Sequence, residues 1–535
     1  MSSPFNAASW LVSRQVAAGG GERVAARGTQ SLTYAELDDL IGEVAAAYRC
    51  LGLRGDDRVM LVMSDDTPML VAILGAFRAG LVAVPVSTMF TGPELAKVLA
   101  DSGARALVCS HEHAESVAVA IQSAPELGHV ILHGETDLPT SELIGKYTWD
   151  DFIATGVSAP VSARQPADTE EDSWALWLYT SGTTGSPKAA MHRHVNIRHV
   201  CETYGTQVLG ITPDDSTLSV AKMFFAYGIG NSVFFPLSVG ATTVLEPRRP
   251  TPKVFLERLT TDRPTLFFGV PTFFAGLLAS DLPDDAFSSV RLAASAGEPM
   301  PASLQARFTE RFGVEIIDGI GSTEALHIFL SNRPGDVHPG TTGIPVPGYE
   351  VEVRDASGLH VEDGVSGSLH VRGESIALGY WRRAVASRQV FNGAWLNTGD
   401  TYVRSADGYY SCLGRSSDML KAGGIWVSPS EVENRLLEHP LVVQAAVVGA
   451  PDSDGLDKPM AVVVVDSDAT ESDLISWCRE GLAHFKAPRH VLFVDDLPKT
   501  ATGKLQRFKV RELLAASSEA GVHSSSDQNT SGAAS

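Results

Sequence analysis

The segment YTSGTTGSPKAAM (Tyr179–Met191) gathers hydroxyl groups, glycines and one lysine in a stretch with little bulk. It overlaps the end of the apolar run WALWLYT, which predicts a buried strand, and α/β folds place phosphate-binding loops after such strands. Small residues leave backbone N–H groups exposed, and the hydroxyls add donors that could wrap an anionic triphosphate. We therefore predict a phosphate-binding loop made of Thr180, Ser181, Gly182, Thr183, Thr184, Gly185 and Lys188.

This loop differs from the standard nucleotide-binding P-loop, which requires Gly, four residues and then Gly-Lys-Ser/Thr. Here Gly182, Gly185 and Lys188 are spaced differently, and Pro187 precedes the lysine. Taken alone, the segment fits a flexible surface loop about as well as a phosphate site. Four later segments favour the phosphate site because they carry complementary chemistry.

The first of these, DGIGSTEALH, places Asp318, Thr323 and Glu324 just beyond the predicted strand VEII. Gly319 and Gly321 allow close approach of a ligand. A carboxylate here can bind Mg²⁺ that bridges phosphate oxygens, and the threonine can donate to a phosphate. The alternative for Glu324 is a solvated or helix-capping acid.

The other three segments supply a further carboxylate and two cations. Asp400 in WLNTGD stands beside a glycine turn and suits paired hydrogen bonds from ribose hydroxyls. GRSSDMLKAGG combines Arg415 with Asp418 at a predicted domain junction. LPKTATGKLQR presents Lys504, a cation that could stabilise the charge that accumulates during attack on an α-phosphate. A common turn, a charged interdomain loop and a solvated lysine are the respective alternatives.

Alternating helix and strand patterns must position these segments. SLTYAELDDLIGEVAAAYRCLGL predicts a helix opened by a capping box of Thr33 and Glu36, and DRVMLVMS, TPMLVAILGAFRAG and LVAVPVS predict a strand, a helix and a strand. The alternation continues to about residue 412 and predicts parallel sheets covered by helices. From Tyr349, strands separated by turn signals predict an antiparallel, β-barrel-like region.

The fold class is therefore α/β, with a large N-terminal domain (1–415) of helix-covered mixed or parallel sheets and the small β-barrel-like region. After GRSSDML, a self-contained α+β pattern predicts a small, mobile C-terminal domain (416–513). The remaining 514–535 is small and polar, which predicts a disordered tail.

Composition excludes several classes of function. A formal charge of −21 over 535 residues repels nucleic acid. Five scattered cysteines show no metal-ligand or disulfide spacing, and the N-terminus lacks a signal peptide, so we expect a cytoplasmic protein. The uncharged stretch from Met223 to Leu245 is long enough to span a bilayer, but its Asn, Pro, Gly, Ser and Thr residues favour a buried helix followed by a strand. We expect no membrane partner.

In this order and at this separation, YTSGTTGSPK, GIGSTE, WLNTGD, GRSSDMLKAGG and PKTATGK resemble the motifs of the adenylate-forming superfamily, which contains acyl-CoA synthetases, adenylation domains and luciferases. The resemblance covers roughly residues 10 to 512. It implies two half-reactions that use ATP, Mg²⁺ and coenzyme A. A carboxylate and ATP form an acyl-adenylate and pyrophosphate, and a thiol then displaces AMP to form a thioester.

The resemblance also implies residue roles. The loop after Tyr179 would hold the β- and γ-phosphates, Thr323 and Glu324 the α-phosphate and Mg²⁺, and Asp400 the ribose. Arg415 would reach the ribose-phosphate region. Two segments would sandwich adenine, namely Gly297-Glu298-Pro299 and Asp318-Gly319-Ile320. Ile320 departs from the family pattern, which usually has an aromatic residue there, so adenine stacking is expected to be weaker or shared differently.

The family alternates its C-terminal domain between an adenylating pose and a thiol-transfer pose. Asp418 matches the hinge position. In the first pose Lys504 assists adenylation, and in the second it swings away while the loop containing Gly423 and Gly424 makes room for the pantetheine arm.

The segments AKMFFAYGIGNS, SAGEP and STEALHIFLSN are most similar to the benzoate-CoA ligase branch. The resemblance implies that the acyl ring is surrounded by Phe225, Ala226, Tyr227, Ala296, Ile320, Gly321 and His327. An aromatic wall, a small alanine and an apolar isoleucine describe a flat slot for a benzene ring. His327 is either a packed core histidine or a group that contacts the substrate. Benzoate leads as the expected acid, followed by hydroxybenzoates and aminobenzoates.

Two alternatives remain at this point. The acyl group could pass to a separate carrier protein instead of free coenzyme A, although the chain shows no carrier domain. The protein could also be a catalytically silent nucleotide-binding scaffold, against which the intact set of Lys504, Glu324 and Asp400 argues. A homodimer is possible, and the sequence does not decide it.

Overall fold

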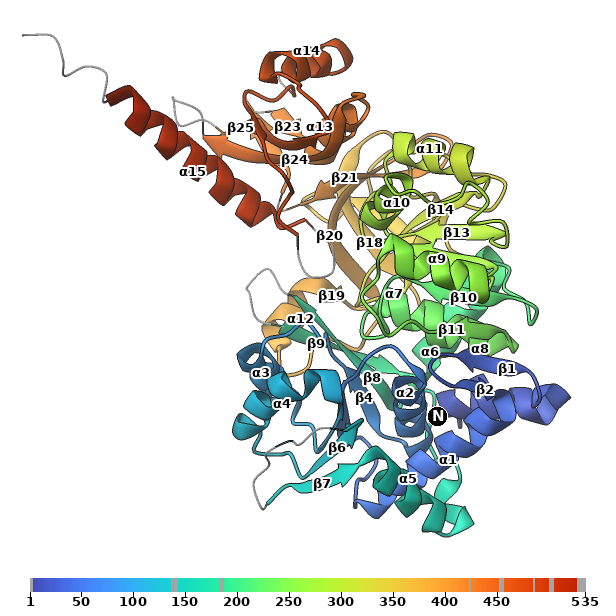
Figure 1. Cartoon of the computed structure of the whole chain (residues 1–535). Helices are drawn as coiled ribbons and strands as arrows, with labels where there is room; N and C mark the ends of the chain where they lie inside the picture. The colour runs from blue at the N-terminus through green and yellow to red at the C-terminus, as the bar shows by residue number, and fades with distance from the viewer. Residues whose placement is uncertain are drawn as a thin grey trace, which may run out of the picture.

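The computed structural model (Figure 1) describes residues 3–135, 138, 143–181, 187–416, 418–422, 425–451, 457–484, 486–499 and 505–526. Two large sheets with helices around them form most of the N-terminal part, and the C-terminal elements stand together at one end of the molecule (orange to red in Figure 1). Helix α15 projects from that end. This arrangement is the mixed α/β fold that the sequence predicts.

The first large sheet has helices on both faces because its strands are apolar on both sides. Its strands, in spatial order, are β7 (Gly145–Thr148), β6 (His129–His133), β5 (Ala106–Ser110), β3 (Arg58–Val62), β4 (Val82–Pro85), β8 (Trp174–Ser181) and β9 (Pro187–Arg193). All neighbouring pairs are parallel except β8 and β9.

Alternate residues of β3 belong to different cores, since side chains alternate along a strand. Val59 and Leu61 lie in one cluster and Met60 and Val62 in another. The first cluster receives helices α1 (Tyr34–Cys50), α2 (Thr67–Ala79) and α5 (Trp149–Ser158), and the second receives α3 (Gly92–Ser102) and α4 (Ala114–Ala120). Thr33 and Glu36 form the predicted capping box at the start of α1.

The second large sheet shares its inner core with the first. Its order is β16 (Ile344–Pro345), β15 (Ile328–Ser331), β14 (Ile316–Gly321), β13 (Leu292–Ser295), β12 (Leu266–Gly269), β10 (Ser216–Ser219), β11 (Thr242–Val244), β1 (Val24–Arg27) and β2 (Ser31–Thr33). Its inner face packs into the cluster that contains α1 and α2. Its outer face carries α9 (Pro252–Thr261), α10 (Pro271–Leu278) and α11 (Ala302–Phe312).

The stretch from Met223 to Leu245 confirms the prediction of a buried helix followed by a strand. It forms α7 (Ala226–Ile229), η7 (Gly230–Phe234), α8 (Phe235–Val239) and β11. It lies beside α6 (His194–Val200) and η6 (Cys201–Val208) in the shared core. Within the described residues, no helix is long and apolar enough to cross a membrane. The other short helices are η1 (Ser9–Ser13), η2 (Val16–Gly20), η3 (His111–His113), η4 (Ile121–Ser123) and η5 (Val161–Arg164).

The predicted antiparallel β region is a five-stranded sheet after residue 349. It consists of β17 (Glu350–Arg354), β18 (Ser366–Arg372), β20 (Trp395–Arg404), β19 (Phe391–Asn392) and β21 (Tyr410–Arg415), with α12 (Ala384–Val390) before β19. All its strand pairs are antiparallel.

The C-terminal elements have their own two small cores, one on each face of a three-stranded sheet. The elements are β22 (Leu420–Ala422), β23 (Ile425–Val427), α13 (Pro429–Leu437), β24 (Val442–Pro451), β25 (Asp457–Val465), α14 (Glu471–Gly481), β26 (Val491–Phe493) and α15 (Arg507–Ser526).

The loop after Tyr179 connects the antiparallel strands β8 and β9. The structure differs from the sequence-based expectation in two places. Asp318 lies inside β14, because the strand continues to Gly321. Helix α15 continues past residue 514, where a disordered tail was expected, because Leu514 is buried against the C-terminal sheet together with Val510.

Candidate active site

Glu324 lies on a tight turn between β14 and β15. Backbone hydrogen bonds close this turn, from Ala325 N–H to Ser322 O (3.2 Å) and from Leu326 N–H to Thr323 O (3.2 Å). Leu326 has a φ of 68°, an unfavourable backbone conformation for a residue with a side chain. Since Leu326 is fully buried, packing holds the strained turn and fixes the direction in which Glu324 leaves it.

Residues 375–381, which follow β18, hold this turn from outside; we call them segment 375–381. Ser375 Oγ donates to Ala325 O (2.7 Å), and Ala377 N–H donates to Glu324 O (2.8 Å). The Tyr380 hydroxyl donates to Glu324 Oε1 at 2.6 Å. Segment 375–381 therefore fixes both the backbone and the carboxylate of Glu324.

The same segment pairs with the hairpin that carries the predicted phosphate loop. Met191 N–H donates to Gly379 O (3.1 Å), Leu378 N–H to Met191 O (2.9 Å) and Trp381 N–H to Ala189 O (2.9 Å). Lys188 Nζ lies 5.3 Å from the centre of the Tyr380 ring. In the hairpin Lys188 is paired with Thr180. The structure thus brings Thr180, Lys188 and Glu324 to one place through Tyr380.

Tyr179, at the start of the loop, is anchored to α3. Its hydroxyl donates to Asp101 Oδ2 (2.8 Å), whose other oxygen accepts from Arg383 Nη2 (2.7 Å). Trp381 Nε1 donates to Asp101 O (3.0 Å). Through Asp101, strand β8 is therefore connected by hydrogen bonds to Trp381 and Arg383, which follow Tyr380.

Thr323 is held by a buried histidine. His192 Nε2 donates to Thr323 O (2.8 Å), and Asn196 Nδ2 donates to His192 Nδ1 (3.0 Å) and to Ser375 O (2.9 Å). Burial lowers the pKa of His192 to about 4, so the ring is neutral. The asparagine thereby fixes the tautomer whose Nε2–H reaches the turn.

Asp400 and Arg415 meet on adjacent strands β20 and β21. Their side chains form an ion pair of 3.1 Å, and Arg415 Nη1 also donates to Thr398 O (2.9 Å). The aspartate side chain is 11% exposed and the arginine side chain 57%. Burial raises the pKa of Tyr380, and the Arg415 charge opposes this rise.

The two predicted adenine segments are adjacent because β13 and β14 are neighbours. Ser295 is paired with Asp318 across these strands, and Met300 N–H donates to Asp318 Oδ2 (3.4 Å). Burial raises the pKa of Asp318 to about 8. Gly297 has a φ of 98°, a conformation suited to glycine, at the point where the chain leaves β13.

The C-terminal elements contact these segments at Glu298. Leu505 N–H donates to Glu298 Oε1 at 3.3 Å. The Asp418 carboxylate lies 3.6 Å from both Arg507 Nε and Arg511 Nη2 of α15. The chain next to Lys504 is therefore held at the predicted adenine segment, and the predicted hinge residue is paired with the helix that follows.

His327 lies in an aromatic enclosure within the shared core. Its ring centre is 4.5 Å from that of Phe235, 5.3 Å from that of Tyr204 and 5.5 Å from that of Tyr227. The His327 side chain is buried, and burial lowers its pKa to about 3. Its Nε2 lies 3.3 Å from Tyr227 O, and its Nδ1 has no hydrogen-bond partner among the described residues. The His327 ring is therefore neutral, and its Nδ1 is unpaired among the described residues.

Glycines allow this enclosure to close. A Cβ at Gly230 would lie 2.3 Å from His327 Cδ2, and a Cβ at Gly321 would lie 2.5 Å from His327 O. The Tyr227 hydroxyl donates to Ala294 O (3.0 Å) and fixes the ring against β13. The other predicted acyl residues belong to the same core or pack on it: Phe225, Ala226, Ala296 and Ile320.

Several predicted residues lie outside the described residues. They are Gly182, Thr183, Thr184, Gly185, Gly423, Gly424 and Lys504. The predicted roles of these residues stay predictions.

Sequence reasoning missed Tyr380, His192 and Asn196. A signal was present in ALGYW, where an aromatic residue follows a glycine, and in MHRHVN, whose first histidine lies on β9, the strand that follows the phosphate loop. Neither pattern names its partner, because the contacts to Glu324 and Thr323 span 56 and 131 residues of sequence.

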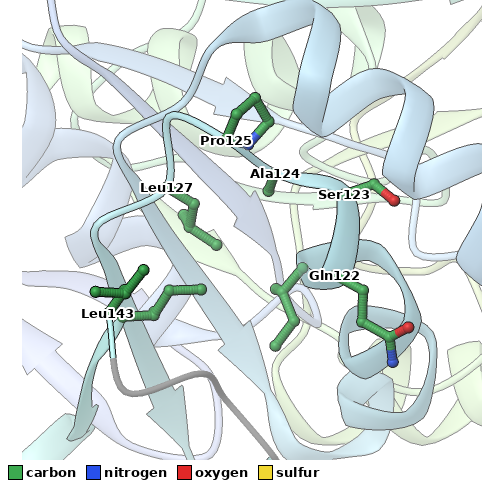
Figure 2. A pocket seen from close by; sticks show the side chains of 8 residues that line it. Gln122, Ser123, Ala124, Pro125, Leu127 and Leu143 are labelled. Atoms are coloured by element: carbon green, nitrogen blue, oxygen red, sulfur yellow. The ribbon is translucent and has the colours of Figure 1, made fainter.

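An apolar pocket of about 490 Å³ lies away from these residues (Figure 2). It is lined by residues 121–125, Leu127, Leu143 and Ile144, beside η4 and the start of β7. None of the predicted site residues lines it, so it is not a candidate active site.

Comparison with known proteins agrees with this geometry. Residues 12–381 match the family of AMP-binding enzymes and residues 431–504 match the AMP-binding enzyme C-terminal domain. The chain is 42% identical over 516 residues to benzoate–CoA ligase from Thauera aromatica, and the aligned region covers 95% of this chain and 96% of that protein.

Two solved structures are similar over nearly the whole chain. A benzoate CoA ligase from Burkholderia xenovorans has 42% identity and a TM-score of 0.86, covering 95% of this chain and 100% of that chain. An anthranilate CoA ligase in complex with anthranoyl-AMP has 37% identity and a TM-score of 0.90, covering 97% and 99%. The present chain belongs to the family of AMP-binding enzymes, with both the main and the C-terminal domain of that family.

Proposed function

We propose that this protein is an ATP-dependent aryl-CoA ligase that activates benzoate or a substituted benzoate. The observation that carries the proposal is the convergence of charged groups from separate elements around Tyr380. Glu324 and Lys188 both contact Tyr380, the charge of Arg415 in the Asp400–Arg415 pair acts on the Tyr380 phenol, and the chain next to Lys504 is joined to Glu298. A buried, uncharged aromatic enclosure lies beyond the Glu324 turn.

Mechanistically, the first half-reaction joins a carboxylate oxygen to the α-phosphorus of ATP and breaks the bond to the β-phosphate oxygen, which leaves with pyrophosphate. Glu324 suits a Mg²⁺ ion because the described residues leave its second oxygen, Oε2, without a hydrogen-bond donor. Mg²⁺ would neutralise developing phosphate charge. Thr180 and Lys188 are assigned to the outgoing phosphates, Asp400 and Arg415 to the ribose-phosphate region, and Lys504 to the charge that accumulates at the α-phosphate.

In the second half-reaction, the thiol of coenzyme A attacks the acyl carbonyl, loses its proton, and displaces AMP. The bond from Leu505 to Glu298 supports the view that the structure represents the adenylating pose. Rotation at Asp418 would bring Gly423 and Gly424 to the site.

The acid is assigned to the enclosure of Tyr227, His327 and Ala226 on chemical grounds. A neutral histidine supplies no cation there, so the carboxylate of the acid must point toward the nucleotide and its ring into the enclosure. Apolar burial and aromatic contacts then bind the ring. The two relatives named for benzoate support an unsubstituted ring as the first choice.

Coenzyme A is the preferred acceptor, since the full-length relatives are named CoA ligases. A separate carrier protein remains the alternative acceptor. A homodimer and a cytoplasmic location also stay predictions, which light scattering and cell fractionation would test.

The test measures pyrophosphate release with a panel of benzoates, with and without coenzyme A. We expect pyrophosphate and AMP with benzoate, and benzoyl-CoA once coenzyme A is added. Absence of pyrophosphate with every acid would refute the proposal. Acyl-adenylate that accumulates without consumption of coenzyme A would point to the carrier.

A further inference from the structure

Tyr380 makes two contacts, and the proposed function assigns no role to Tyr380 itself. Its hydroxyl donates to Glu324 Oε1 (2.6 Å), and its ring lies under Lys188 Nζ (5.3 Å to the ring centre). These are the carboxylate and the lysine assigned to Mg²⁺ and the phosphates. One side chain therefore contacts both charged groups.

The hydroxyl acts as a donor over the whole working range of pH. A tyrosine phenol has an ordinary pKa of about 10 and keeps its proton near neutral pH, so at 2.6 Å from a carboxylate oxygen it is the donor. A hydrogen bond to a charged acceptor is stronger than one between neutral groups. It also restricts the carboxylate to one orientation, with Oε1 engaged and Oε2 free of donors among the described residues.

The backbone around Tyr380 leaves the ring little freedom. Gly379 and Trp381, on either side of Tyr380, form backbone hydrogen bonds with Met191 and Ala189 of β9. Tyr380 itself forms an isolated antiparallel β-bridge with Ala190. The side chain is 7% exposed and packs on Phe391, with ring centres 5.3 Å apart. The ring position is thus set by the hairpin that bears Lys188.

We propose that Tyr380 is a positioning residue that aligns the Glu324 carboxylate for the metal through its hydroxyl and supports Lys188 for the phosphates through its ring. This inference rests on the proposed function, which assigns Glu324 to Mg²⁺. It predicts that the two contacts can be separated by substitution.

Tyr380→Phe removes the hydroxyl and keeps the ring. Because partners that orient a metal ligand typically contribute about 10- to 100-fold to metal affinity or activity, we expect Mn²⁺ to bind roughly 10-fold more weakly. The half-saturating Mg²⁺ concentration for adenylation should rise by a similar factor. Tyr380→Leu removes both contacts and should additionally raise the KM for ATP a few-fold, the size expected for an exposed cation–π contact.

Binding is measured without turnover by electron paramagnetic resonance of Mn²⁺ in the presence of a nonhydrolysable ATP analogue. Attack of coenzyme A on supplied benzoyl-adenylate should be unchanged in Tyr380→Phe, since that step uses neither contact. Tyr409→Phe is the matched control, because Tyr409 also donates to a carboxylate (Asp336 Oδ2, 2.8 Å) and stacks on a side chain (His338) away from the Glu324 turn.

A double-mutant cycle separates positioning from a general structural role. In a Glu324→Gln background, loss of the Tyr380 hydroxyl should cost no further Mn²⁺ affinity. Equal loss in both backgrounds, or unchanged Mn²⁺ affinity in Tyr380→Phe, overturns the inference. If Tyr380→Phe is poorly folded by thermal melting, Tyr380→His keeps a ring with an N–H donor and should bind Mn²⁺ more tightly than Tyr380→Leu; equal affinity of these two also overturns it.

Failure of the proposed function would look different. A wild-type protein that releases no pyrophosphate with any acid refutes that function, whereas the Mn²⁺ measurement still reports on Tyr380 and Glu324.

Discussion

The nucleotide side and the acid side of the candidate site are built in opposite ways. On the nucleotide side, Glu324, Lys188 and the Asp400–Arg415 pair come from three different sheets, and all of these residues except the buried Asp400 are at least partly exposed. A C-terminal contact to Glu298 completes the arrangement. On the acid side, Tyr227 and His327 lie in one continuous core without charge. The nucleotide side therefore depends on how separate elements are placed, whereas the shape of the acid enclosure is set by packing.

The comparison predicts that changes on the nucleotide side affect rates of separate steps, whereas changes on the acid side affect substrate binding and stability together. Four substitutions test this difference.

Lys504→Ala should have the largest effect. Loss of the cation that we assign to the developing charge should lower pyrophosphate release about 100- to 1,000-fold. Attack of coenzyme A on supplied acyl-adenylate should stay within a few-fold, as rapid-quench assays would measure. Lys499→Ala removes a nearby lysine that pairs with Asp496 (3.2 Å) and serves as the control. Equal loss of both half-reactions would contradict the two-pose account.

Gly230→Ala should damage the acid side. The new Cβ would lie 2.3 Å from the His327 ring, which three aromatic rings already enclose. We expect a stability loss of about 1–3 kcal/mol from overpacking and a raised KM for benzoate with little change in the KM for ATP. Thermal melting and initial-rate kinetics measure the two effects.

Gly276→Ala is the matched control, because no atom lies within 4 Å of its added Cβ. If Gly230→Ala raised the KM for ATP as much as the KM for benzoate, the proposed difference between the two sides of the site would be contradicted.

Asp318 tests the boundary between the two sides through pH. Burial raises its pKa to about 8 from the ordinary value of 3.8, so the folded chain keeps a proton that the unfolded chain loses between these values. The free energy of unfolding should fall as pH rises through this window, by at most about 1.4 kcal/mol per pH unit. Asp318→Asn should flatten this slope in urea titrations between pH 5 and 8.

The control for this measurement is Asp214→Asn, whose native side chain is 91% exposed. An Asp318→Asn variant with the wild-type slope would show that Asp318 ionises in the folded protein much as it does in the unfolded chain.

Arg511→Ala should have the smallest effect. Its 3.6 Å contact with Asp418 is partly exposed, and such pairs contribute about 0.2–1 kcal/mol. We expect adenylation to slow by at most about 5-fold, with thiol transfer unchanged or faster, because the adenylating pose loses one of its ion pairs. Stopped-flow comparison of the two half-reactions measures this shift. Arg23→Ala, which removes an exposed pair with Asp214, should change neither rate.

Most strands and helices of this chain could be predicted because local patterns determine them. The capping box of Thr33 and Glu36, the apolar strands and the buried stretch after Met223 all depend on neighbours in sequence. The antiparallel pairing of β8 with β9 escaped prediction, because an apolar strand does not reveal the direction of its partner. The burial of Leu514 could not be predicted from its neighbours in sequence, because it depends on a sheet formed by earlier strands.

For the site, the residue types and their order in the chain were sufficient to propose the chemistry. Glycines, hydroxyls, acids and one late lysine stand in motifs that resemble those of adenylate-forming enzymes, and this resemblance implies a nucleotide-dependent activation before any contact is known. Only the tertiary structure decided that Tyr380 joins Glu324 to Lys188, that His192 holds Thr323, and that the His327 ring is enclosed and neutral. The reason is physical: motif chemistry belongs to residue types, whereas orientation and protonation depend on partners that folding brings from distant parts of the chain.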